Sequence, residues 1–123
     1  MQCSRPQVLA CLKRHQDELA IASVVGQELW FGCRRLPTSA KRLAIERYLD
    51  EVVAVSMPIL PYDQAAAEWH AAERVRLTQL GKTPPFADGQ IGAIAKVNGL
   101  ILVTLNPKDY VAFTGVKVED WSR

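Results

Sequence analysis

The sequence lacks the features that would place it in several large classes of protein. It has no apolar run of the roughly 18 residues that a membrane-spanning helix needs, and it opens without a signal-peptide pattern. Its three cysteines, Cys3, Cys11 and Cys33, form no C-x-x-C pair, so neither a disulfide scaffold nor a zinc site is expected. These absences favour a cytoplasmic protein with reduced thiols and no membrane association.

A large excess of charge of one sign is also lacking. The formal net charge of +2 is too small to indicate nucleic-acid binding by itself. The basic residues are unevenly placed, however, because from Arg34 to Arg47 five of them stand against one acid, Glu46. Such a stretch is typical of a solvated helix–loop–helix surface, and a role in binding phosphate groups stays open beside that interpretation.

The 123 residues, 49% hydrophobic and 23% charged, are enough for one folded domain that spans residues 1–123. Helical and strand patterns alternate, which favours an α/β fold with a mostly parallel sheet. Ser23, Ser39 and Asp63 are suited to cap helices, and Gly81 is suited to end one. The predicted helices cover residues 5–15, 23–33, 39–50, 64–80 and 88–97, and the predicted strands cover residues 19–22, 52–56, 100–104 and 116–118.

Acidic and amide side chains occur where ligands usually bind in such a fold, beyond the carboxyl ends of parallel strands. Glu28 lies on the second turn of the helix after residues 19–22, and Asp88 opens the helix before residues 100–104. Asn106 and Asp109 directly follow that last strand. Oxygen ligands without a Cys or His cluster suit a hard cation such as Mg²⁺ or Mn²⁺. The sequence therefore predicts a divalent-metal site.

Each of these residues also has a simpler interpretation. Asp88 would make a good helix N-cap, Glu28 could be a solvated glutamate, and Asp109 could belong to a turn. The position of Glu28 favours the metal site, because it lies beside Leu29 within the apolar stripe of its helix. An acid in such a stripe is costly unless it is paired or bound to metal.

Four stretches, in order, resemble one known family: "IASVVGQELWFG", "AAEWHAAERVRLTQLGKTPPFADGQIGAIA", "GLILVTLNPKDY" and "GVKVEDWS". They are similar to PIN-domain proteins, specifically the VapC-type ribonuclease toxins of bacterial toxin–antitoxin pairs, from about Pro6 to Trp121. The resemblance implies a three-layer α/β/α domain that cleaves RNA by hydrolysis assisted by Mg²⁺ or Mn²⁺. It also implies a cognate antitoxin as partner and a homodimer.

The resemblance implies roles for individual residues. Glu28 and Asp88 match the family's metal ligands, and Asn106, expected to assist catalysis, holds a position where many members have a further aspartate and others have asparagine. Thr104 matches a hydroxyl residue near the cluster, and Asp109 would support it from the following turn. The basic stretch would hold RNA phosphates by charge through four residues: Arg34, Arg35, Lys41 and Arg42.

One departure from the family pattern concerns the start of the chain. Members usually begin with a central strand that ends in Asp-Thr-Asn and supplies the first metal carboxylate, whereas this sequence opens "MQCSRPQVLA". We therefore expect the central strand and the first acid to be missing and the ribonuclease activity to be impaired. Two alternatives stay open. The chain could be an inactive remnant that binds an antitoxin or dimerises, or a misassigned start could hide the missing strand.

Overall fold

The structure is a computed structural model that describes residue 14, residues 19–54 and residues 57–120. These residues belong to two compact units. The N-terminal unit contains the described residues up to Pro61, and the C-terminal unit contains residues 62–120. The helix predicted over residues 5–15 lies outside the described residues except at Arg14, which is helical. Cys3, Cys11 and Trp121 also lie outside them.

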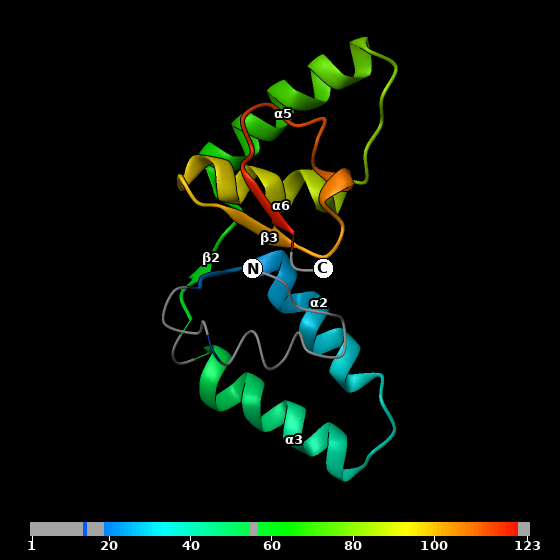
Figure 1. The fold of residues 1–123 in the computed structure, drawn as a ribbon, viewed down its shortest axis with the longest axis vertical. Coiled ribbons are helices and arrows are strands. Elements are labelled where there is room, and N and C mark those ends of the chain that lie inside the picture. The colour runs from blue at the N-terminus through cyan, green and yellow to red at the C-terminus, as the bar shows by residue number, and fades with distance from the viewer. Residues whose placement is uncertain (1–13, 15–18, 55–56, 121–123) are drawn as a thin grey trace. The chain divides into compact units, whose positions relative to one another are not determined.

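The N-terminal unit combines a two-stranded parallel sheet with helices (Figure 1). Ile21 pairs with Ile59, and Ala22 pairs with Leu60. The helices predicted after Ser23 and Ser39 are both present, and the strand predicted over residues 19–22 is confirmed in its second half. The elements are β1 (Ile21–Ala22), α2 (Ser23–Arg34), α3 (Ala40–Tyr48), the π-helical turn η3 (Leu49–Val53) and β2 (Ile59–Leu60).

The strand predicted over residues 52–56 is wrong where the structure describes it. The chain continues from α3 through η3, and Ala54 is still helical. Leu49, Val53 and Met57 are buried four positions apart, and the Met57 N–H donates to the Val53 carbonyl at 3.1 Å. Burial at this helical spacing outweighs the strand preference of consecutive valines. The parallel partner of β1 is consequently β2, which lies later in the chain.

Capping was predicted correctly for α3 and incorrectly for α2. The Ser39 side chain accepts a hydrogen bond from the Arg42 N–H at 3.2 Å, as expected of an N-cap serine. Ser23, by contrast, is the first helical residue, and Ala22 occupies the N-cap position without a side-chain bond. Cys33 is 3% exposed within the apolar core of this unit, which agrees with a reduced structural thiol.

In the C-terminal unit two packed helices accompany a second parallel pair of strands (Figure 1). The predicted helices 64–80 and 88–97 are confirmed, although the second begins at Phe86. Asp63 caps the first of them by accepting from the Ala66 N–H at 2.9 Å, and Gly81 adopts a φ of +74° at its end. The elements are α5 (Gln64–Gln79), α6 (Phe86–Val97), β3 (Leu102–Thr104), the 3₁₀ turn η4 (Pro107–Asp109) and β4 (Val118–Asp120).

The strand predicted over residues 100–104 is confirmed for its second part, but it is not buried on both faces. Leu100 and Ile101 are 44% and 60% exposed, and β3 itself is half-buried. β3 pairs with β4, which begins at Val118, two residues later than the predicted edge strand. Within the described residues each sheet has two strands, and β1 and β3 are not paired with each other. The missing central strand stays a prediction.

The core of the C-terminal unit lies where α5 meets the segment after β3. Leu77 of α5 packs with Tyr110 and Phe113, and these three side chains are 1%, 6% and 4% exposed. The buried residues of α6 are small at Gly89 and Gly92, which lets neighbouring side chains approach the helix closely. In the part of the chain that the structure describes, no helix is long and apolar enough to cross a membrane.

Candidate metal and RNA site

Asp88 lies in the first turn of α6, at its third residue. Pro85 occupies the N-cap position and makes no side-chain bond to the helix, so the interpretation of Asp88 as an N-cap is wrong. Its carboxylate is half-buried. A negative charge is favourable at this end of a helix because the unpaired N–H groups there carry partial positive charge.

Two neighbours define the environment of Asp88. The hydroxyl of Tyr110 hydrogen-bonds to the carboxylate, and Asp109 acts on it by charge. Burial raises the pKa of Asp88, the negative charge of Asp109 raises it further, and the Tyr110 hydrogen bond lowers it. Burial and both carboxylates raise the pKa of Tyr110 in turn. At the start of α6, Asp88 therefore has a phenol as hydrogen-bond partner and a second carboxylate within electrostatic reach.

A series of tight turns holds Asp109 in place. The Asn106 N–H donates to the Thr104 Oγ1 at 3.0 Å, and the Asp109 N–H donates to the Asn106 carbonyl at 3.1 Å. Asn106 and Asp109 are both exposed, whereas Thr104 is half-buried at the end of β3. The structure thus places the predicted residues Thr104, Asn106 and Asp109 on one short connection, and Asp109 reaches Asp88 electrostatically.

Two residues of this region were missed by sequence reasoning. Tyr110 was part of the recognised stretch "LNPKDY", but nothing in the sequence indicates that its hydroxyl meets Asp88. Asp120 lies opposite Thr104 in the register of β3 and β4. The predicted edge strand ended at Val118, which left Asp120 outside it. A carboxylate just beyond the predicted C-terminal strand is the signal that could have identified it.

Glu28 belongs to α2 in the N-terminal unit, and it is exposed. Glu28 is therefore not an acid in a buried stripe, and that prediction is wrong. Val25 and Leu29 pack against the core of the unit, but adjacent residues of a helix point in different directions, so Glu28 faces away from Leu29's contacts. Its role as a metal ligand depends on the family resemblance alone.

Three of the four predicted RNA-contact residues are exposed: Arg34, Arg35 and Lys41. The Arg34 guanidinium lies 4.8 Å from the centre of the Trp30 ring, and that of Arg35 lies 5.4 Å from the Phe31 ring. These cation–π contacts hold the two arginines at the end of α2.

The fourth residue, Arg42, is engaged within its own unit. Its Nε donates to Oε1 of Glu46 at 2.8 Å, and its Nη1 donates to the Leu36 carbonyl at 3.1 Å. These bonds join α3 to the loop that precedes it. The structure therefore gives Arg42 a folding role in addition to any contact with phosphate.

The residues present around Asp88 fit a hard divalent cation. Within the described residues, no three His, Cys, Asp or Glu side chains lie close enough together to hold a metal ion. Asp88 nevertheless lies within electrostatic reach of Asp109, and Mg²⁺ commonly uses one or two protein carboxylates together with waters and phosphate oxygens. Burial raises the pKa of Asp88 and the charge of Asp109 raises it further, and a divalent cation would favour the ionised carboxylate against both effects.

A small cavity of about 110 Å³ opens beside the first turn of α6. Two cationic side chains and no carboxylate contribute to its wall, so this side of the turn favours an anionic ligand. The lining residues are His70, Arg74, Leu77, Thr78, Lys82, Thr83, Pro84, Pro85, Phe86 and Phe113.

Comparison with known proteins gives clear relatives, although no family model matches the chain. It is 31% identical over 109 residues to the tRNA(fMet)-specific endonuclease VapC of Shigella flexneri, covering 88% of this chain and 79% of the relative. It is 27% identical over 106 residues to the protein of the same name from Salmonella typhimurium, covering 85% and 76%. Ribonuclease VapC2 of Haemophilus influenzae is 24% identical over 116 residues, with 94% and 84% covered.

Solved structures that resemble this chain include proteins of the same kind as these relatives. FitAcB from Neisseria gonorrhoeae matches with a TM-score of 0.79 at 25% identity, covering 94% of this chain and 85% of that chain. DNA-bound VapBC from Salmonella typhimurium matches with a TM-score of 0.74 at 23% identity, covering 94% and 84%. The predicted α/β fold class with parallel strands is thereby confirmed.

Proposed function

Because this chain belongs to the VapC family of PIN-domain toxins, we propose that it is a ribonuclease that hydrolyses RNA with the help of Mg²⁺ or Mn²⁺. The observation that supports this most directly is the cluster of Asp88, Asp109 and Tyr110 at the start of α6. Relatives named endonuclease and ribonuclease support the reaction class. The cytoplasm, where RNA is available, is the proposed location.

In this proposal Asp88 and Glu28 are the protein's metal ligands, and Asn106 assists as an amide oxygen ligand. Asp109 adds a second negative charge beside Asp88. A bound cation would supply an activated water and would neutralise charge that develops on the phosphate. The chain's own residues prepare the site, because Tyr110 orients the Asp88 carboxylate and Thr104 orders the turn that carries Asn106.

RNA would be held by charge rather than read by sequence. Arg34, Arg35 and Lys41 are exposed and can contact phosphates, and Arg42 would keep the loop between α2 and α3 in shape through Glu46. Neutralising Arg34, Arg35 and Lys41 together should weaken RNA binding and flatten its dependence on salt by about one unit of logarithmic slope per lost contact. An unchanged salt slope would remove these residues from the RNA site.

The decisive experiment is calorimetric titration of Mn²⁺ into the full chain and into Asp88→Asn. We expect the wild type to bind Mn²⁺ and the variant to lose most of that binding, and cleavage of a structured RNA should fall with it. Asp50→Asn is a matched control, because Asp50 is an exposed aspartate of η3 in the N-terminal unit. Equal binding by wild type and Asp88→Asn would refute the proposed site.

A second candidate function follows from the absence, in the described residues, of three acids grouped closely enough to hold a metal. The chain would then be an inactive family member that binds a cognate antitoxin or forms a homodimer. One of its structural neighbours, VapBC-5 of Mycobacterium tuberculosis, is a member of the VapBC family of toxin–antitoxin systems. A folded chain that binds no Mn²⁺, cleaves no RNA and runs as a dimer in light scattering would favour this function.

A further inference from the structure

We propose that Glu73 is a positioning residue for the site, which holds the segment after β3 against α5 and thereby holds Tyr110 against Asp88. The inference rests on the proposed function, because its expected effect is on metal binding at Asp88. Its structural basis is a group of hydrogen bonds between α5 and the segment from Ala112 to Thr114.

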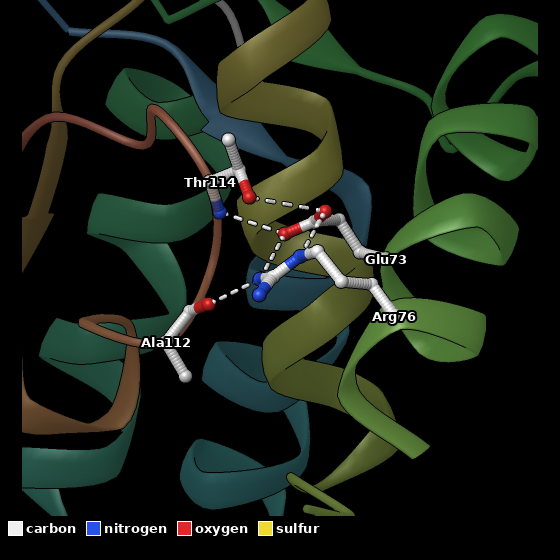
Figure 2. A network of polar contacts seen from close by, with 4 residues as sticks. All are labelled: Glu73, Arg76, Ala112 and Thr114. Atoms are coloured by element: carbon white, nitrogen blue, oxygen red, sulfur yellow. Dashed lines mark hydrogen bonds and ion pairs between the residues drawn. The ribbon is translucent and has the colours of Figure 1, made fainter. Parts of the chain in front are cut away.

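The Glu73 carboxylate is surrounded by donors, as Figure 2 shows. The Thr114 N–H donates to Oε1 at 2.7 Å, and the Thr114 hydroxyl donates to Oε2 at 3.2 Å. Arg76, one turn further along α5, donates to both carboxylate oxygens and also to the Ala112 carbonyl at 2.6 Å. Two residues of α5 therefore fix the backbone at Ala112 and at Thr114.

The same segment carries Tyr110. The Phe113 N–H donates to the Tyr110 carbonyl at 3.1 Å, and the two ring centres are 6.4 Å apart. Both rings are buried with Leu77 of α5. A displacement of Thr114 from α5 would therefore be transmitted over four residues to Tyr110.

The segment is also held at its other end. The Tyr110 N–H donates to the Pro107 carbonyl at 3.0 Å, and the turn before it is bonded to Thr104 of β3. Tyr110 thus lies between two anchors, of which one is the sheet and the other is Glu73. Its ring lies against α6 one turn after Asp88, since a Cβ at Gly92 would be 3.8 Å from Tyr110 Cδ1, and from there its hydroxyl hydrogen-bonds to the Asp88 carboxylate.

Glu73 is 6% exposed, and a buried carboxylate is costly unless donors surround it. An apolar side chain at this position would avoid that cost, but it could not bond the Thr114 N–H. The hydrogen bonds of Glu73 therefore fix the position of the segment. Residues that bond to metal ligands, without touching the metal themselves, orient those ligands in a comparable way.

The test compares Mn²⁺ affinity in Glu73→Gln, Tyr110→Phe and the double variant, each as the full chain. Glutamine keeps the size of the side chain but loses the charge that Arg76 and Thr114 bind. We expect Glu73→Gln to weaken Mn²⁺ binding by about tenfold in the wild-type background, the lower end of losses seen for groups that orient metal ligands. In the Tyr110→Phe background it should weaken binding no further, because Glu73 acts through Tyr110.

Glu46→Gln is the matched control, since it removes the charge of another Arg–Glu pair one helical turn apart, in the other unit. It should leave Mn²⁺ affinity unchanged. A tenfold loss on adding Glu73→Gln to Tyr110→Phe would overturn the proposal, as would an unchanged affinity in Glu73→Gln alone.

A measurement without metal separates failure of this inference from failure of the proposed function. The NMR resonance of the Asp88 side-chain carboxyl should shift in Glu73→Gln and in Tyr110→Phe but not in Glu46→Gln. Amide exchange should accelerate at Phe113 and Thr114 more than at Ile94 in the buried part of α6. An unmoved Asp88 resonance, or exchange that rises equally everywhere, would show that Glu73 stabilises the unit without positioning the site.

Discussion

Glu73 and Arg76 form a two-point ion pair in which Nε donates to Oε2 at 3.0 Å and Nη2 donates to Oε1 at 2.9 Å (Figure 2). The Arg76 hydrogen bonds lower the pKa of Glu73 from 4.5 to about 2 in spite of burial, which raises it, and both Thr114 donors add to the lowering. The pair joins residues one turn apart on α5, and its remaining bonds reach a segment 36 to 41 positions later.

This pair predicts a pH dependence of stability. Because the pKa of folded Glu73 is depressed, its contribution is complete above the ordinary value of 4.5 and is lost as pH falls towards about 2. The contribution is on the order of 2–3 kcal/mol of unfolding free energy. Denaturant unfolding of wild type and Glu73→Gln should therefore differ by this amount at neutral pH and converge near pH 2. A difference that stays constant with pH would contradict the prediction.

Substitutions at the two neighbours of Asp88 should shift the pH at which Mn²⁺ binding begins, and they should shift it in opposite directions. Tyr110→Phe removes a hydrogen bond that lowers the pKa of Asp88, so Mn²⁺ binding, which needs the ionised carboxylate, should begin at higher pH. Asp109→Asn removes a charge that raises the same pKa, so the onset should move to lower pH. Calorimetric titrations across a pH series measure both shifts. Shifts of the same sign would show that these residues do not act through Asp88.

Gly89 allows α6 to approach the imidazole of His70. A Cβ at this position would overlap the His70 ring, which is 3% exposed and bonded through Nδ1 to the Tyr62 hydroxyl at 2.8 Å. Gly89→Ala should therefore destabilise the protein by about 1–3 kcal/mol in spite of alanine's helix preference. Thermal unfolding measures the loss. The same substitution in a His70→Ala background should cost less, since the overlapping ring is gone.

Replacing Gly26 with alanine is expected to stabilise the protein, in contrast to the same change at Gly89. A Cβ there would lie 3.7 Å from the Ile21 side chain, an ordinary contact, and one at Gly32 would meet nothing within 4 Å. Because both glycines are inside α2, Gly26→Ala and Gly32→Ala should each raise the unfolding free energy by about 0.5–1 kcal/mol. Equilibrium unfolding in urea checks both, and a loss at Gly26 alone would indicate that close packing against Ile21 requires glycine.

Local signals in the sequence determined the parts of the fold that depend on neighbours within one helical turn. Ser39 and Asp63 begin their helices and Gly81 ends one as predicted, because capping bonds and left-handed glycines involve only nearby backbone groups. The same kind of information placed Asp88 in the first turn of a helix. The sequence therefore predicted that the candidate metal site has a carboxylate at the start of a helix.

Interactions between residues far apart in the sequence determined the features that local sequence patterns do not predict. Residues 52–54 have the composition of a strand, yet the chain continues as a helix there because Val53 is buried in a core with Ile21 and Cys33. Glu28 lies beside apolar residues in sequence but is exposed, because its orientation depends on which face of α2 meets the core. Tyr110 reaches Asp88, and Thr114 reaches Glu73 across 41 positions, only once α5, α6 and the segment after β3 have packed together.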